Sequence, residues 1–219
     1  MIKETDFETF LFISKNKYQI FVYDKNNLKN LYTEEIKIND GIELHNLSNF
    51  LDENIYKIEK TIKNFIKNII LIIEDDKVLD IGLSLKKKTY EKHINQKHLE
   101  ISLVEVKDVF RENYQDQIIM HMIIVNNDKN DDNLFLEVNF ISIPNSFTFY
   151  FEKLLGNHQI KISRYMSGSY IKNFFKEDSL EISMMANKLN YGLNKNEVQL
   201  VSKSLENKGF FEKFFQLFS

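Results

Sequence analysis

A run of aliphatic residues, Ile69–Ile73, follows directly on a segment with helical periodicity, and these two neighbours limit the fold more than any other feature. Between about residues 46 and 68, apolar side chains recur at the spacing of one helix face. The aliphatic run is far too short to cross a bilayer, so it predicts a buried strand. A helix followed by a buried strand is typical of folds that mix the two kinds of element.

Strands and helices continue to alternate on both sides of this pair. Aromatic and β-branched residues favour strands, while a capping-box pattern at Ser102 and the proline at Pro144 mark helix starts. This mixed order indicates an α/β or α+β protein, and α/β is the fold class that we expect. The predicted strands cover residues 9–15, 18–24, 31–38, 69–74, 118–125, 134–143 and 158–165. The predicted helices cover about 46–68, 102–113, 145–156 and 167–175.

Composition argues against several classes of protein. The net charge of −3 does not suit a general nucleic-acid binder, which usually carries an excess of basic residues. The absence of cysteine excludes disulfides and thiolate metal sites. The first residues lack the basic and apolar regions of a signal peptide, so we expect a cytoplasmic protein unless something holds it on a membrane surface.

No catalytic, cofactor or metal site is predicted, and we expect the protein not to be an enzyme. The five histidines lack metal-binding spacing, and His121 is expected to be a structural histidine within an apolar strand. Ser167–Ser169 is expected to cap a helix, and Glu74–Asp76 to form an exposed turn rather than a cation site. The basic run 85–98 is expected to be a solvated face rather than a phosphate contact. The sequence contains no glycine-rich phosphate loop.

The chain ends in KGFFEKFFQLFS, residues 208–219, which predicts a short amphipathic helix with its apolar residues on one side. Such a helix would lie in a membrane interface, pack on the protein's own core, or fill a groove on a partner. We favour the membrane, because bulky phenylalanines follow a polar stretch, 176–207, that we interpret as a tether. Lys208 and Lys213 would then meet anionic headgroups. The residues expected to insert are Phe210, Phe211, Phe214, Phe215, Leu217 and Phe218.

From about Leu47 to Phe175 the chain resembles FtsA, the actin-like bacterial protein that tethers the division ring to the membrane. The helix and strand over 47–74 resemble those that precede the inserted subdomain of that family, and ISLVEVKDVFREN resembles the helix of the subdomain. The terminal KGFFEKFFQLFS resembles the family's membrane-targeting helix. The resemblance implies a reduced actin-like lobe over 1–175 that carries an inserted β-α-β subdomain over about 77–143.

The residues with which this family holds nucleotide phosphate are missing. The family has an aspartate and a glycine-rich turn at the first strand, where this chain has Phe12, Ser14 and Lys15. A second phosphate loop of the D-I-G-G-G type is absent after Phe175. The resemblance therefore implies a member without ATP or another cofactor.

The expected function is that of a non-enzymatic, membrane-associated adaptor in bacterial cell division, placed at the inner face of the cell membrane. Its expected partners are anionic lipid, other division proteins at the septum and further copies of itself, because several weak membrane helices on one oligomer bind tightly. The alternative is a soluble scaffold or binding module, similar to the pilus-assembly protein PilM, whose terminal helix packs on its own core. An enzyme of unknown chemistry is the third reading, and no group of residues supports it.

Overall fold

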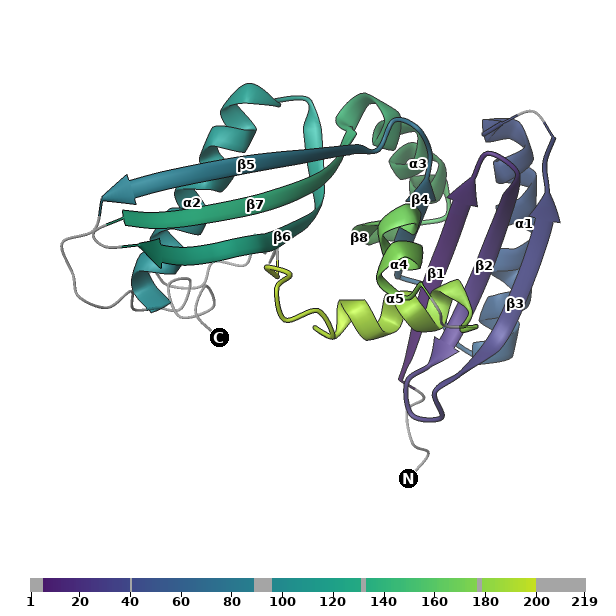
Figure 1. Ribbon diagram of the computed structural model, residues 1–219. Coiled ribbons are helices and arrows are strands. Elements are labelled where there is room, and N and C mark those ends of the chain that lie inside the picture. Colours follow the sequence, from purple (N-terminus) through teal and green to yellow (C-terminus); the bar gives the residue numbers. More distant parts are fainter. Residues whose placement is uncertain (1–5, 40, 89–95, 131–132, 177–178, 200–219) are drawn as a thin grey trace, which may run out of the picture.

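The computed structural model describes residues 6–39, 41–88, 96–130, 133–176 and 179–199, arranged around two separate β-sheets (Figure 1). The strands are β1 (Phe7–Ser14), β2 (Lys17–Asp24), β3 (Lys29–Lys37), β4 (Asn68–Glu74), β5 (Leu79–Lys88), β6 (Gln117–Asn130), β7 (Asn133–Pro144) and β8 (Lys161–Ser167). The helices are α1 (Leu44–Ile62), α2 (Gln96–Asn113), α3 (Asn145–Asn157), α4 (Gly168–Phe174) and α5 (Ile182–Asn190).

The larger sheet, which we call the main sheet, has the order β3-β2-β1-β4-β8. Its first three strands are antiparallel neighbours, while β4 runs parallel to both β1 and β8. Helices α1 and α3 pack on one face, and α4 and α5 pack on the other. Because β4 is covered on both faces, it can be aliphatic throughout its buried part, Ile69–Ile73. The buried strand, the helix before it and the α/β class expected from the sequence are confirmed.

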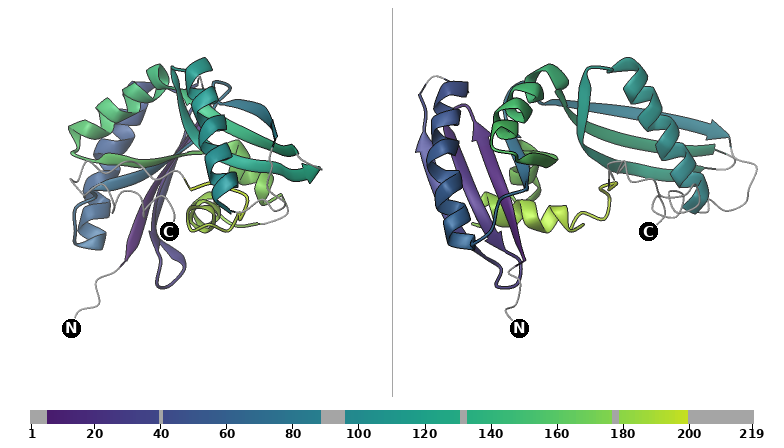
Figure 2. Two further views of the ribbon diagram at one scale, coloured as in Figure 1. Left: turned by 90° about the vertical axis from the view of Figure 1, so that its left-hand side faces the viewer. Right: turned by 180° about the vertical axis from the view of Figure 1, so that it is seen from behind.

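The smaller sheet, which we call the second sheet, has the order β5-β7-β6 and is antiparallel throughout. Helix α2 covers one of its faces, so the sheet and helix form a body apart from the main sheet (Figure 2). Phe110 of α2 stacks on Phe140 of β7, with ring centroids 4.5 Å apart. This body lies within the span that the sequence suggested for an inserted subdomain, about 77–143.

The prediction of a tether over 176–207 does not hold for residues 179–199, the longest part of this stretch that the structure describes. Helix α5 lies there, and it buries Ile182, Met185 and Leu189 against the main sheet. These residues are spaced three and four apart, so they form one apolar stripe on the helix. The stripe is short and has few aliphatic residues, which is why the sequence predicts a tether with one or two partly formed helices there rather than a packed helix.

Two further expectations need correction. Helix α2 begins at Gln96, so Ser102 is not its cap but a buried residue inside it, 2% exposed. Strand β5 was not predicted, because it is an edge strand whose outward side chains are polar and whose last three residues are lysines. Its inward residues Ile81, Leu83 and Leu85 alternate with period two, which is the signal that could have revealed it.

Candidate functional site at the junction of the two sheets

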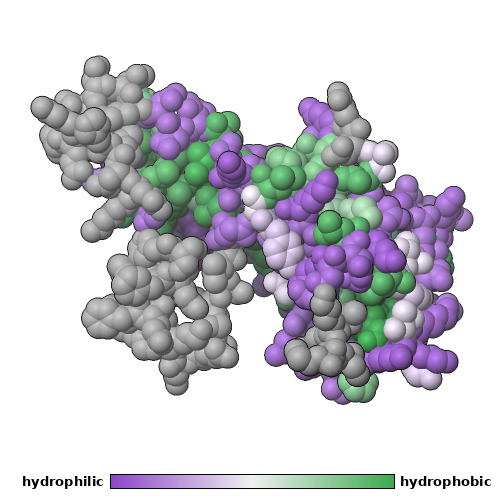
Figure 3. Space-filling model, turned by 90° about the horizontal axis from the view of Figure 1, so that it is seen from below, coloured by the Kyte–Doolittle hydropathy of each residue, from purple (hydrophilic) through white to green (hydrophobic). Residues whose placement is uncertain are grey.

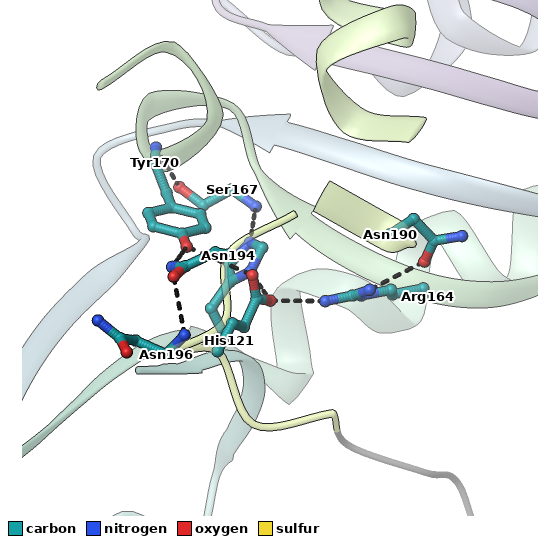
Figure 4. Close-up of polar contacts among 8 residues, drawn as sticks. His121, Arg164, Ser167, Tyr170, Asn190, Asn194 and Asn196 are labelled. Carbon is teal, nitrogen blue, oxygen red and sulfur yellow. Dashed lines mark hydrogen bonds and ion pairs between the residues drawn. The ribbon is translucent and has the colours of Figure 1, made fainter. Parts of the chain in front are cut away.

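A buried polar cluster joins the main sheet, the second sheet and the last described residues (Figure 4). His121 enters it from β6, where the register shifts between Ile119 and His121 against β7. A bulge of this kind turns the side chain of the bulged strand toward a new direction. Arg164 enters from β8, and Ser167 from the start of α4.

The hydrogen bonds of His121 fix its protonation state. The backbone N–H of Ser167 donates to Nε2 of His121 over 2.9 Å, so Nε2 is the unprotonated nitrogen. Nδ1 of His121 therefore carries the proton and donates it to Oε1 of Glu197 over 2.8 Å. The ring is completely buried, and this burial lowers the pKa of His121 below its usual range against the opposing pull of the Glu197 carboxylate. The histidine is thus a neutral connector between two elements.

Glu197 carries the negative charge of the cluster, and its side chain is 1% exposed. Nη2 of Arg164 donates to Oε1 of Glu197 over 2.6 Å, and Nη1 of Arg164 donates to Oδ1 of Asn190 over 2.8 Å. The hydroxyl of Tyr170 lies 3.3 Å from Oε2 of Glu197 and accepts a hydrogen bond from Asn194. Burial raises the pKa of Tyr170 to about 12. The buried carboxylate is therefore matched by one cation and several donors, as a buried charge requires.

The segment 194–199, which we call the hook, brings Glu197 into this cluster. Its main chain pairs with the free edge of β6: Ile124 N–H donates to the carbonyl of Asn196, and Val198 N–H donates to the carbonyl of Met122, each over 2.8 Å. The pairing is antiparallel, with Ile123 opposite Glu197. The hook thus leaves α5 on the main sheet and adds a short strand to the second sheet. It ties the two bodies together with both main-chain and side-chain bonds.

Because its groups are buried and hydrogen-bonded to one another, this cluster is better suited to coupling the two sheets than to catalysis. His121 has no exposed surface and both of its ring nitrogens are used, so it cannot exchange a proton with a substrate. No group of three or more potential ligands among the described residues could hold a metal ion. No helix in that part of the chain is long and apolar enough to cross a membrane.

The junction makes stability depend on pH through His121. Because its pKa is lowered in the folded protein, the unfolded chain takes up a proton first as pH falls below about 6.5. Stability should therefore be full above that pH and fall as pH drops toward the lowered pKa, by up to about 1.4 kcal/mol per pH unit. Urea titrations at several pH values should show this slope, and His121→Gln should remove it. The same replacement at exposed His45 is the matched control, and an equal slope in both variants would contradict the assignment.

The carboxyl edge of the main sheet, where α/β folds usually bind ligands, is occupied by paired side chains. Lys172 pairs with Glu74 over 2.5 Å, and Lys15 pairs with Asp76. Gly168 lies so close to the ends of β1 and β4 that a Cβ at this position would stand 3.0 Å from the ring of Phe12 and 3.1 Å from Glu74. Glycine is needed here for close packing of α4 against the strands.

The structure locates several side chains that the sequence singled out. Ser167 caps α4 by accepting a hydrogen bond from Tyr170 N–H, as expected. The turn expected at Glu74–Asp76 begins one residue later, because Glu74 is the last residue of β4. His121 is the buried structural histidine that the sequence predicted. The residues expected to meet the membrane, Lys208, Phe210, Phe211, Lys213, Phe214, Phe215, Leu217 and Phe218, lie outside the described residues.

The sequence did not predict which residues join His121 in this cluster. Glu197 lies 76 residues away and Arg164 lies beyond a separate helix, so no spacing pattern connects them. One signal was present: the chain has only two arginines, and Arg164 is placed within a strand. An arginine there needs an acidic partner, because an unpaired buried charge is costly.

Comparison with solved structures places this fold. A chain of the PilM–PilN type IV pilus biogenesis complex superimposes with a TM-score of 0.51 at 8% identity, over 76% of this chain and 49% of its own. The two proteins share a fold. This protein spans only about half the length of that pilus chain. No protein-family model matches the sequence. No curated protein sequence is similar to it either.

Two other solved structures have lower scores. A Bacteroides thetaiotaomicron protein with an actin-like ATPase fold and unknown function has a TM-score of 0.39 at 16% identity, over 80% of this chain and 58% of its own. The cytoplasmic domain of EpsL, an inner membrane component of the type II secretion system of Vibrio cholerae, has a TM-score of 0.35 at 9% identity, over 75% of this chain and 57% of its own. The specific resemblance to FtsA stays a prediction.

Proposed function

We propose that this chain is a non-enzymatic adaptor that assembles with other proteins at the inner face of a bacterial membrane, as FtsA does in cell division. The observation that carries the proposal is the amphipathic pattern of residues 208–219. These residues follow closely after the hook, which is bonded to both bodies of the protein. An anchor attached at this point would hold both sheets at the membrane.

Two features of the fold support this proposal. Ion pairs fill the carboxyl edge of the main sheet, which suits a protein that binds partners rather than converts a substrate. The likeness to a chain of the PilM–PilN complex supports a role in a protein assembly, because that complex is itself an assembly for pilus biogenesis. The second sheet offers an edge strand, β5, whose outer side pairs with no other strand among the described residues and could bind a partner or a further copy.

Vesicle co-sedimentation tests the membrane anchor. The full chain should bind vesicles that contain anionic lipid, and Phe211→Ser with Phe214→Ser should weaken binding roughly 30-fold or more, because each phenylalanine loses interfacial burial. Glu212→Ser with Gln216→Ser changes the polar side of the same segment and is the matched control. Equal partitioning of the two double variants would remove the anchor from the proposal.

Cellular position tests the role in division. A fluorescent fusion of the full chain should gather at the septum, and the variant with both phenylalanines replaced should be spread through the cytoplasm. The alternative is a soluble scaffold related to pilus assembly, which the likeness to the PilM–PilN chain favours. In that case the terminal helix packs on the protein's own core, and hydrogen exchange would show residues 208–219 protected without any lipid.

The absence of nucleotide chemistry is part of this proposal and has its own test. Addition of ATP and magnesium should leave the melting temperature of the full chain unchanged, since a ligand that binds only the folded state would raise it. A clear rise would contradict the non-enzymatic proposal and leave the membrane anchor to be judged by the vesicle experiment.

A further inference from the structure

One edge of the main sheet presents two loops side by side, away from the junction with the second sheet. We call it the amino edge, because β1 and β4 begin there. It consists of the turn 25–28 between β2 and β3 with the first residue of β3, Lys29, and of the loop 63–67 between α1 and β4. The two loops are neighbours in space, since Lys25, Phe65 and Lys67 line one pocket. In Figure 1 this edge lies at the bottom of the main body, where β2 ends and β1 begins.

Each loop carries one large apolar side chain into solvent. Phe65 is 73% exposed, the highest fraction of any large apolar side chain among the described residues, and Leu28 is 66% exposed. Single exposed apolar residues are ordinary, but these two stand at the tips of adjacent loops. Leu28 and Lys63 both have positive φ, of 51° and 56°, a conformation that disfavours side chains with a Cβ. The fold therefore holds both tips in defined, tight turns.

Lysines surround these tips. Lys29, Lys63 and Lys67 are exposed, and none of them has an ion pair with the described residues. Lys25 is partly buried and is paired with Asp6. Three further carboxylates lie nearby: Asp24 is 2% exposed and accepts bonds from its own turn, Glu59 accepts a bond from the N–H of Ile66, and Glu8 is bonded to α5. Among the described residues, the exposed and unpaired charges at this edge are therefore lysines, although the whole chain is slightly negative.

A pocket of about 400 Å³ lies between the two loops. Its lining is rich in hydrogen-bond donors: Lys25, Lys67, Asn64 and Asn68. Thr9 also lines it, is 3% exposed, and has a buried hydroxyl without a hydrogen-bond partner among the described residues.

The single carboxylate in the lining, Glu8, is already occupied from the other side. Asn187 and Tyr191 each donate to it over 3.0 Å. The groups of the pocket that remain able to bind a ligand are therefore hydrogen-bond donors and cations. Such groups suit an anion with several acceptor oxygens.

We propose that the amino edge is a second membrane-contacting surface. Leu28 and Phe65 enter the headgroup layer of an anionic bilayer, Lys29, Lys63 and Lys67 lie against its phosphates, and one headgroup phosphate occupies the pocket. This inference extends the membrane association proposed above to residues that are independent of the terminal segment.

The composition of the edge favours lipid over a protein partner. The centres of protein interfaces are depleted of lysine and enriched in tyrosine, methionine, arginine and tryptophan. At the amino edge, two exposed apolar side chains are surrounded by lysines. This arrangement is typical of elements that bind a membrane surface. Figure 3 views the molecule from this side and shows hydrophilic and apolar residues intermixed on the main body rather than one wide apolar patch.

Vesicle binding by full-length variants tests this surface. On phosphatidylglycerol-containing vesicles, Lys63→Gln with Lys67→Gln should weaken binding about 25-fold, because each lysine near an anionic surface contributes about fivefold in affinity. Lys57→Gln with Lys153→Gln makes the same change of charge at exposed sites of α1 and α3, and should bind nearly as the unmodified chain does. Phe65→Ser should weaken binding about tenfold, and Tyr56→Ser, at a residue 71% exposed on α1, is its control.

The outcomes separate this surface from the terminal anchor. Loss of binding in the Lys63/Lys67 and Phe65 variants, but not in their controls, supports the amino edge, whatever the Phe211/Phe214 variant shows. If both edge variants bind as their controls do, the amino edge is not a membrane surface, even where the terminal phenylalanines prove essential. Equal binding of the unmodified chain to vesicles of phosphatidylcholine alone would also overturn the proposal, because it would show that the lysines do not act through lipid charge.

Discussion

Glu197→Ala should lower the free energy of unfolding by about 3–5 kcal/mol, which is the cost of removing one partner from a buried charge pair. The variant leaves Arg164 without its carboxylate, and it leaves the proton on Nδ1 of His121 without an acceptor. Urea unfolding followed by circular dichroism measures the loss. The main-chain bonds of Asn196 and Val198 to β6 would remain, but without the Glu197 side chain the hook should detach more easily.

The controls for this variant separate charge from shape. Glu197→Gln keeps an acceptor for His121 but removes the charge, so its loss should lie between zero and that of the alanine variant. Glu112→Ala removes an exposed glutamate of α2 and should change stability by less than about 0.5 kcal/mol. A loss below about 1 kcal/mol for Glu197→Ala would show that the junction does not hold the two bodies together.

The sequence predicts the main body well where one physical pattern dominates. The run Ile69–Ile73 can only be a buried strand, and α1 shows a wide apolar stripe, so both were expected near their observed positions. The strands β1 and β2 follow from aromatic and β-branched residues with a short turn between them.

The polar junction could not be predicted in the same way. Its members are ordinary polar residues in sequence, and only the folded chain brings them together. Glu197 stands in a stretch of asparagine and lysine that is typical of a linker. What makes it a buried residue is tertiary: the free edge of β6 offers two main-chain bonds, and Arg164 offers a charge. Local propensity says nothing about either of these.

The junction also bears on how an adaptor of this design would work. The hook is the last described segment before residues 208–219, so a pull on a membrane anchor would act first on Glu197 and its partners. A load of that kind would be shared between both sheets rather than carried by one. In the proposed adaptor, the relative placement of the two bodies would thereby be linked to the state of the anchor.

Phe140→Ala should lower the stability of the second sheet by about 3–5 kcal/mol, the usual cost of removing a fully buried phenylalanine. Phe140 is completely buried, and it stacks on Phe110 at the centre of a core that has few other members. Native-state hydrogen exchange measures the effect amide by amide. The amides of β6 and β7 should lose protection, while those of β1 and β4 should keep most of theirs, because each sheet has its own core.

The matched control is Phe149→Ala on α3, where the same side chain is 58% exposed and its loss should cost less than about 1 kcal/mol. A uniform loss of protection over both sheets in Phe140→Ala would contradict two separately stable bodies and show one cooperative unit. Combining Phe140→Ala with Glu197→Ala sharpens the comparison. If the junction is what couples the bodies, the double variant should confine the loss of protection to the second sheet more completely than Phe140→Ala alone, since mutations at coupled sites do not act independently.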